Sequence, residues 1–339
     1  MSNRTVSWAA LGAACAVLFA VAPLLSPGSL NLGVSLLGYL AIAQAWNVLA
    51  GFSGQVSLGS AAFVATGGYT SALVLAHTGV SWPAALALAA VMSALLAALV
   101  SIPLLRLRGD YFAVGTLAIS VAIQALLNNW PWAGGASGFT IPVGSVPSGG
   151  NLFQVALLVA ALAMSLAVFI RHSGFGLRLA AIRDNEAAAA GLGVAVRRHR
   201  VAAFVASSAL IGMAGAVIAF QFIAVSPDEI ANLTWSLNAV LMAIVGGTGT
   251  VLGPVAGVVV VYYGLTQELA SLQTLSELLE GALFIVIVRI APGGIWPIAC
   301  QLARRLAALA SRPDPVPEDE VPRLPAEPTG TELSAVDLT

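Results

Sequence analysis

Long apolar runs dominate this chain, and short polar segments separate them. Many runs reach about 18 residues without alternating apolar and polar positions, which is typical of transmembrane helices rather than strands. Helices also satisfy their own backbone groups within a bilayer. The pattern predicts an all-α, polytopic integral membrane protein. Its roughly ten spans are predicted at 8–25, 30–50, 55–76, 83–105, 111–130, 151–170, 201–224, 233–248, 251–268 and 275–296.

Composition supports this fold class. Hydrophobic residues make up 59% of the chain and charged residues only 9%, whereas soluble domains carry about 25% charged residues. The first run, 8–25, is interpreted as a retained span rather than a cleaved signal peptide. Its charged flank is Arg4 alone, and the sequence "APLLSPG" makes a poor cleavage site.

Arginine placement predicts the topology. With both termini in the cytoplasm, the inner segments hold every arginine outside the spans, and Arg289 lies near the inner end of the last span. The outer loops near 26–29, 77–82, 130–150, 225–232 and 270–274 hold none, which follows the positive-inside rule. The inner arginines are Arg4, Arg106, Arg108, Arg171, Arg178, Arg183, Arg197, Arg198, Arg200, Arg304, Arg305, Arg312 and Arg323.

Two regions differ from the spans. The tail at 311–339 is acidic and rich in proline, so we expect it to be disordered, leaving 1–310 as the membrane domain. The inner loop at 171–200 contains a predicted helix at 177–190, which Gly191 or Gly193 can end. Such a loop can be a topological anchor or a docking site. Glu186 in the middle of the predicted helix favours docking.

Two glycine-rich segments interrupt the apolar pattern, "GFSGQVSLG" at 51–59 and "GGTGTVLGP" at 246–254. Transporters often line their pathway with helices broken in corresponding positions of two halves, so the pair indicates a solute pathway and a possible internal repeat. Close helix packing and tight turns are the alternative explanations. The candidate pathway residues are Gln44, Asn47, Gly51, Gly54, Gln55, Ser57, Gly59, Ser60, Gln124, Asn238, Gly246, Gly247 and Gly249.

These pathway candidates are neutral amides, hydroxyls and glycines, which suit a polar or zwitterionic solute. Each amide or hydroxyl can instead hold two helices together. The spans lack buried Asp, Glu or His, which argues against a proton-coupled carrier and places the energy source in another subunit.

Several other chemistries are excluded. All 14 basic residues are arginine, so a Walker A loop, which needs lysine, is absent. Metalloprotease, thiol-redox and serine-hydrolase motifs are also absent, and the three histidines are far apart in sequence and all fall in loops. We expect no disulfide between Cys15 and Cys300, no metal or bound cofactor, no nucleic-acid partner and no enzymatic activity.

Several segments, in this order, carry a family resemblance over about 250 residues. "NVLAGFSGQVSLGSAAFVATGGYTSALV" at 47–74 and "RLRGDYFAVGTLAISVAIQALLNNW" at 106–130 resemble signatures of the LivM-type permeases of branched-chain amino acid ABC importers. The segments "GFGLRLAAIRDNEAAAAGLGV" at 174–194, "VGGTGTVLGPVAG" at 245–257 and "RIAPGGIW" at 289–296 are similar to later ones. Ser60 stands where the family often has His, and Asp110 replaces a usually apolar residue.

The resemblance implies a permease subunit in a bacterial inner membrane. A LivH-like second permease would complete the pathway, and two LivG/LivF-like ATPase subunits would bind ATP and Mg. An extracytoplasmic binding protein would deliver the amino acid. The inner loop would then be the coupling loop, with Arg183, Asp184, Glu186, Ala187, Ala188, Gly191 and Gly193 facing the ATPases. Related substrates such as urea, short amides or aromatic acids remain alternatives, as does a stand-alone channel.

Overall fold

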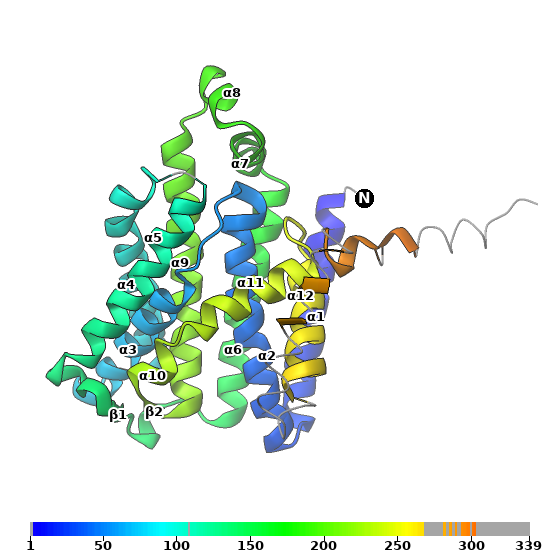
Figure 1. Cartoon of the computed structure of the whole chain (residues 1–339). Coiled ribbons are helices and arrows are strands. Elements are labelled where there is room, and N and C mark those ends of the chain that lie inside the picture. Colours follow the sequence, from blue (N-terminus) through cyan, green and yellow to red (C-terminus); the bar gives the residue numbers. More distant parts are fainter. Residues whose placement is uncertain are drawn as a thin grey trace, which may run out of the picture. The chain divides into compact units, whose positions relative to one another are not determined.

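The computed structural model describes residues 3–107 and 109–267, and then only short pieces at 281–282, 285–286, 289, 293–298 and 300–302. The described chain is mostly helical, and its long helices run side by side (Figure 1). The helices are α1 (Asn3–Val21), α2 (Pro27–Asn47), α3 (Ser60–His77), α4 (Trp82–Leu104), α5 (Asp110–Asn128), α6 (Gly149–Arg171), α7 (Gly174–Asp184), α8 (Glu186–Gly191), α9 (Val196–Phe222), α10 (Pro227–Ile230), α11 (Thr234–Gly246) and α12 (Gly253–Val258). The two short strands are β1 (Phe139–Thr140) and β2 (Ala224–Val225).

Seven helices of the described part are long and apolar enough to cross a membrane, which agrees with a multi-pass protein. They are Ser7–Leu24, Pro27–Phe52, Trp82–Leu104, Asp110–Asn128, Gly149–Arg171, Val196–Phe222 and Pro227–Gly246. The predicted third span is a helix of 18 residues, but it begins at Ser60 rather than at 55. More than half of the predicted tenth span and all of the acidic tail lie outside the described residues, so the count of ten stays a prediction.

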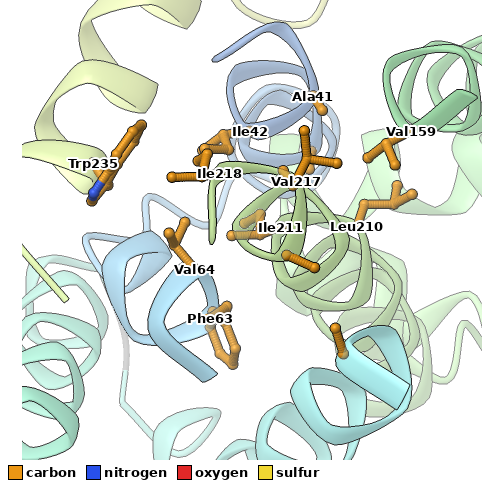
Figure 2. Close-up of a cluster of buried hydrophobic side chains, with 14 of the residues drawn as sticks. Ala41, Ile42, Phe63, Val64, Val159, Leu210, Ile211, Val217, Ile218 and Trp235 are labelled. Carbon is orange, nitrogen blue, oxygen red and sulfur yellow. The ribbon is translucent and has the colours of Figure 1, made fainter. Parts of the chain in front are cut away.

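Helix α9 is the centre of the packing. It contacts α2, α3, α4 and α6 along most of its 27 residues. Figure 2 shows its side chains Ile211, Val217 and Ile218 between residues of the neighbouring helices, including Ile42 of α2 and Val64 of α3. Burial of these apolar side chains on several sides explains why α9 lacks the one-sided pattern of a surface helix.

Glycines bring α3 and α9 into direct backbone contact. A Cβ atom on Gly67 would lie 2.0 Å from the carbonyl oxygen of Gly212, and one on Gly215 would lie 2.2 Å from that of Val64. No other residue fits such an approach, and small residues at helix contacts are a general feature of membrane proteins. Gly212 therefore takes part in the close packing of α9 against α3.

Buried hydroxyl groups also link helices, through bonds to backbone groups. Ser207 of α9 donates to the carbonyl oxygen of Ala45 in α2 at 2.6 Å. The Ser236 hydroxyl of α11 accepts from the backbone N–H of Ala61 in α3 at 2.8 Å. That N–H lies in the first turn of α3, where it lacks a partner within the helix. Sequence reasoning missed both serines because a single hydroxyl changes an apolar pattern very little.

The segments predicted to be inner lie together at one end of the helices, and the segments predicted to be outer meet at the other end. The inner segments around Gly54, Gly109 and Glu186 line one small shared pocket. Strand β1, from the outer loop at 130–150, pairs antiparallel with β2, with Phe139 opposite Val225. Figure 1 shows α7 and α8 at the end opposite the strands. That the arginine-rich end faces the cytoplasm stays a prediction from the positive-inside rule.

We expect Gly67→Ala to destabilise the protein by about 1–3 kcal/mol, because its methyl group would overlap the backbone of α9. The thermal unfolding midpoint in detergent measures the change. Gly12→Ala is the matched control, since a Cβ atom there meets nothing within 4 Å. Equal midpoints for the two variants would contradict the backbone contact.

Candidate functional site

Helix α2 ends in an interruption of its α-helical pattern. After Asn47 the chain forms a π-helical turn, Val48–Phe52, and residues 54–59 then run without regular structure until α3 begins. Hydrogen bonds hold this connector: Ser53 Oγ donates to the Leu49 carbonyl at 2.5 Å, and the Gly54 N–H donates to the Ala50 carbonyl at 3.1 Å. Gly54 has a φ of +72°, a conformation that other residues rarely adopt. The predicted break is therefore present.

The side chain of Asn47 joins the two glycine-rich segments. Its Nδ2 donates to the carbonyl oxygen of Thr250 at 2.8 Å, and its Oδ1 accepts from the N–H of Gly249 at 2.7 Å. Both partners lie in the turn between α11 and α12. Asn47 is fully buried, and these two bonds pair both ends of an amide that would be costly to bury alone.

Gly51 allows the two segments to approach this closely. A Cβ atom at this position would lie 2.3 Å from the backbone nitrogen of Gly249. It would also lie 2.2 Å from Oδ1 of Asn47, the atom that binds the Gly249 N–H. Any larger residue at Gly51 would therefore displace the turn that Asn47 holds. Gly249 has a φ of +73°, so it too requires the freedom of glycine.

Arg183 of α7 adds a third segment to this contact. Its Nη1 donates to the carbonyl oxygen of Gly51 at 2.9 Å, and its Nε contacts Oδ1 of Asp184 at 3.2 Å. Its stem lies over Gly54, whose Cβ would come 2.7 Å from Cγ of the arginine. Carbonyl groups at the end of a helix carry partial negative charge, which favours a cation there. We call Asn47, Gly51, Arg183, Gly249 and Thr250 the inner junction.

The predicted single helix at 177–190 is wrong, because the inner loop forms two helices. Asn185 has extended backbone angles, φ −157° and ψ 106°, and its Oδ1 accepts from the Ala188 N–H at 3.0 Å. It therefore caps α8, as asparagine commonly does. Glu186 begins α8 instead of lying in mid-helix, and it pairs with Arg200 of α9 at 3.0 Å. Gly191 ends α8, as predicted, and Gly193 has a φ of +82°.

The α7–α8 hairpin has a buried face and an exposed apolar face. Leu179, Ile182 and Ala189 are buried, whereas Leu177 is 75% exposed and Leu192 is 84% exposed. Leu192 directly follows α8, and α8 lies at the end opposite β1 and β2 (Figure 1). Asp184, Ala187, Ala188 and Gly191 are exposed as well. Apolar side chains exposed on a projecting element are typical of a contact surface for another protein.

Other predicted pathway residues surround the connector. Gln55, Ser57 and Gly59 lie in it, and the Ser57 carbonyl accepts from Nε1 of Trp46 at 2.6 Å. Gly246 and Gly247 are at the end of α11. Gln44 and Ser60 are buried, and their side-chain polar atoms have no hydrogen-bond partner in the described part of the chain.

Two of the predicted pathway residues lie away from the inner junction. Gln124 is near the opposite end of α5, where its Nε2 lies 3.4 Å from Oδ1 of Asp228. Asn238 is half-buried within α11, outside the turn that Asn47 binds. The structure therefore gathers the glycine-rich segments and Asn47, but not these two amides.

The sequence prediction omitted residues that hold the connector. Thr116 of α5 accepts from the Leu58 N–H at 2.9 Å, and Trp46 supplies the indole bond to Ser57. Thr250 stands within the second glycine-rich motif, which was a usable signal. Thr116 had no comparable signal, because one threonine in an apolar helix is common. Within the described residues, no cluster of His, Cys, Asp or Glu is placed to hold a metal ion.

Known proteins resemble this chain over most of its length. Residues 29–288 match the family model described as "Branched-chain amino acid transport system / permease component". The high-affinity branched-chain amino acid permease protein LivM of Salmonella typhimurium is 30% identical over 308 residues, covering 81% of this chain and 71% of LivM. LivM of Escherichia coli is 28% identical over the same shares of the two chains.

Another relative is named for a different substrate. The autoinducer 2 import system permease protein LsrC of Klebsiella pneumoniae is 31% identical over 157 residues, covering 45% of each chain. No solved structure matches the chain.

The glycine-rich segments that meet at the inner junction lie within the matched residues 29–288, as does the hairpin bound to them. The family model and the LivM relatives indicate the same kind of protein, and each match covers most of this chain. The chain therefore belongs to the branched-chain amino acid transport permease family, as the permease component of an ABC-type transporter.

Proposed function

We propose that this inner-membrane protein pairs with a homologous, LivH-like permease to form a pathway for branched-chain amino acids. An extracytoplasmic binding protein delivers the substrate, and two separate LivG/LivF-like ATPase subunits bind ATP and Mg and supply the energy. The observation that supports this most directly is the bond from Arg183 to Gly51. It connects a hairpin with an exposed apolar face to the point where two interrupted spans meet.

The α7–α8 hairpin is the proposed contact with an ATPase subunit. Leu177 and Leu192 expose apolar surface at the arginine-rich end, where a cytoplasmic partner would bind. Glu186 pairs with Arg200 at the start of α9, so a force on α8 reaches the central helix of the fold. The coupling residues expected from the family resemblance are thus divided between an exposed surface and internal contacts.

The inner junction is the proposed route from that hairpin to the spans. Arg183 binds the end of α2, and Asn47 of α2 binds the turn between α11 and α12. A displacement of α7 therefore acts on α2 and on α11–α12 together. Discontinuous helices of this kind form the moving parts around the solute site in several transporter folds. The role of these residues as pathway lining stays a proposal.

The proposed substrates are leucine, isoleucine and valine, because the LivM relatives are branched-chain amino acid permeases. The neutral buried groups of Gln44 and Ser60 fit a zwitterion better than an ion. Relatives such as LsrC serve another solute, so the substrate needs its own test. Urea, short amides and aromatic acids are the alternatives to compare.

We expect Arg183→Ala to reduce ATP-driven uptake roughly tenfold, because one charge-assisted hydrogen bond to the backbone is lost. Uptake and ATP hydrolysis are measured together in proteoliposomes that hold the complete transporter. ATP hydrolysis should persist, since the hairpin still binds. Arg178→Ala removes an exposed charge from the same helix and should transport normally. Wild-type uptake in the Arg183 variant would refute the proposed connection.

We expect Leu192→Arg to reduce co-purification of the ATPase subunits, because a charge would replace the most exposed leucine of the hairpin. Val143→Arg is the control, since Val143 is 70% exposed in a predicted outer loop. Quantitative pull-down from membranes measures the bound ATPase. An equal yield with both variants would show that the hairpin is not the contact.

We expect excess unlabelled leucine, isoleucine or valine to reduce uptake of radiolabelled leucine by the complete transporter at least about tenfold. Urea, acetamide, benzoate and autoinducer 2 should leave that uptake unchanged, because they lack the branched aliphatic zwitterion. If one of these four competes and the branched amino acids do not, the substrate assignment is wrong. ATP-independent uptake would instead indicate a stand-alone channel.

A further inference from the structure

An apolar groove runs along the membrane-spanning part of the chain and reaches Val251 and Leu252, which follow Thr250 of the inner junction. It lies between α1, α2, α6 and α12 and encloses about 650 Å³. Leucine and alanine side chains dominate its walls, among them Leu11 and Ala14 of α1, Leu40 of α2 and Ala160 of α6. A groove of this composition at membrane depth accommodates a hydrocarbon chain without leaving polar groups unpaired.

One end of the groove is basic. Arg171, the last residue of α6, and the adjacent His172 line it there. Arg171 is exposed, and no carboxylate of the described residues forms an ion pair with it. This end is the arginine-rich one, which the positive-inside rule assigns to the cytoplasmic leaflet. Basic pockets between transmembrane helices on that side bind anionic lipid headgroups.

The length of the groove fits a lipid anchored at this end. Its lining extends from Leu157 of α6 to His172, the residue after this helix, which corresponds to about 22 Å at the usual rise of a helix. The hydrocarbon core of a bilayer is about 30 Å thick. A groove that starts at the headgroup level therefore reaches beyond the bilayer midplane. This depth matches an acyl chain of the cytoplasmic leaflet whose phosphate lies beside Arg171.

Two observations favour a lipid over a protein helix as the occupant. Helix α1 forms one wall, and only 6% of its span is buried within the chain, so most of its apolar surface is open to lipid. The unpaired cation at one end has a counterpart in a lipid phosphate, whereas an apolar transmembrane helix offers none. Headgroup charge should also decide selectivity, since every phospholipid offers similar acyl chains.

We propose that this groove binds one anionic phospholipid, with its phosphate beside Arg171 and an acyl chain between α1 and α6. The site is independent of the amino acid and ATPase assignments, so its test does not depend on them. The lipid fills space that α1 leaves open and holds α1 against the rest of the chain.

Native mass spectrometry of the purified full chain, with defined lipids added in detergent, tests the proposal. We expect one bound dioleoyl phosphatidylglycerol to be retained several-fold more than dioleoyl phosphatidylcholine. Arg171→Gln should remove this preference, whereas Arg178→Gln, which removes a charge from α7 outside the groove, should keep it. Equal retention of both lipids by the unaltered protein, or an unchanged preference in Arg171→Gln, would overturn the headgroup assignment.

A second pair of variants tests the groove itself. Ala14→Trp places an indole in the groove and should abolish the retained lipid. Ala13→Trp adds the same bulk at the preceding residue of α1, which is exposed but does not line the groove, and it should leave lipid retention unchanged. If Ala14→Trp instead splits a dimer of the purified chain that carries no lipid, the groove is a protein interface and the lipid proposal is wrong.

Discussion

The structure depends on one constraint, the need to pair backbone polar groups wherever a helix stops inside a membrane. Asn47, at the end of α2, meets this need in the α11–α12 turn, because its amide binds both an N–H and a carbonyl there. The cost of an unpaired group in hydrocarbon is several kcal/mol. A single side chain therefore fixes the relative position of α2 and the α11–α12 turn, which are about 200 residues apart in sequence.

Two kinds of contact follow from this constraint. Between α3 and α9, both helices are continuous and their backbones meet through glycines without free polar groups. At the inner junction the helices are broken, and side chains supply the missing bonds. Contacts of the first kind are compact and resist change. Contacts of the second kind depend on a few hydrogen bonds, so they are better suited to move during transport.

Arg183 gives the inner junction its connection to the arginine-rich end of the molecule. An arginine can reach the end of α2 because its long stem lies over Gly54, where no side chain obstructs it. Its guanidinium binds the Gly51 carbonyl in a part of the structure that water reaches only partly. The α7–α8 hairpin thus exposes leucines to a partner and, through Arg183, binds the inner junction. This arrangement is in keeping with a permease that takes energy from separate subunits.

The sequence by itself determined the fold class, most spans, the grouping of the connecting segments and the family. Apolar runs, arginine positions and glycine motifs are local signals, and each is readable without knowing what lies opposite. The sequence also identified both glycine-rich segments and the inner loop as candidate functional segments.

Only the tertiary structure decided how these parts meet. A buried asparagine such as Asn47 has the same local signature whether it lines a pathway or binds a turn, because its partners are distant in sequence. The same holds for Thr116 and Ser236, whose roles come from backbone groups of the connector and of α3. The break at Asn185 was missed because alanines on both sides favour a helix, while the side-chain cap that ends it becomes evident only in three dimensions.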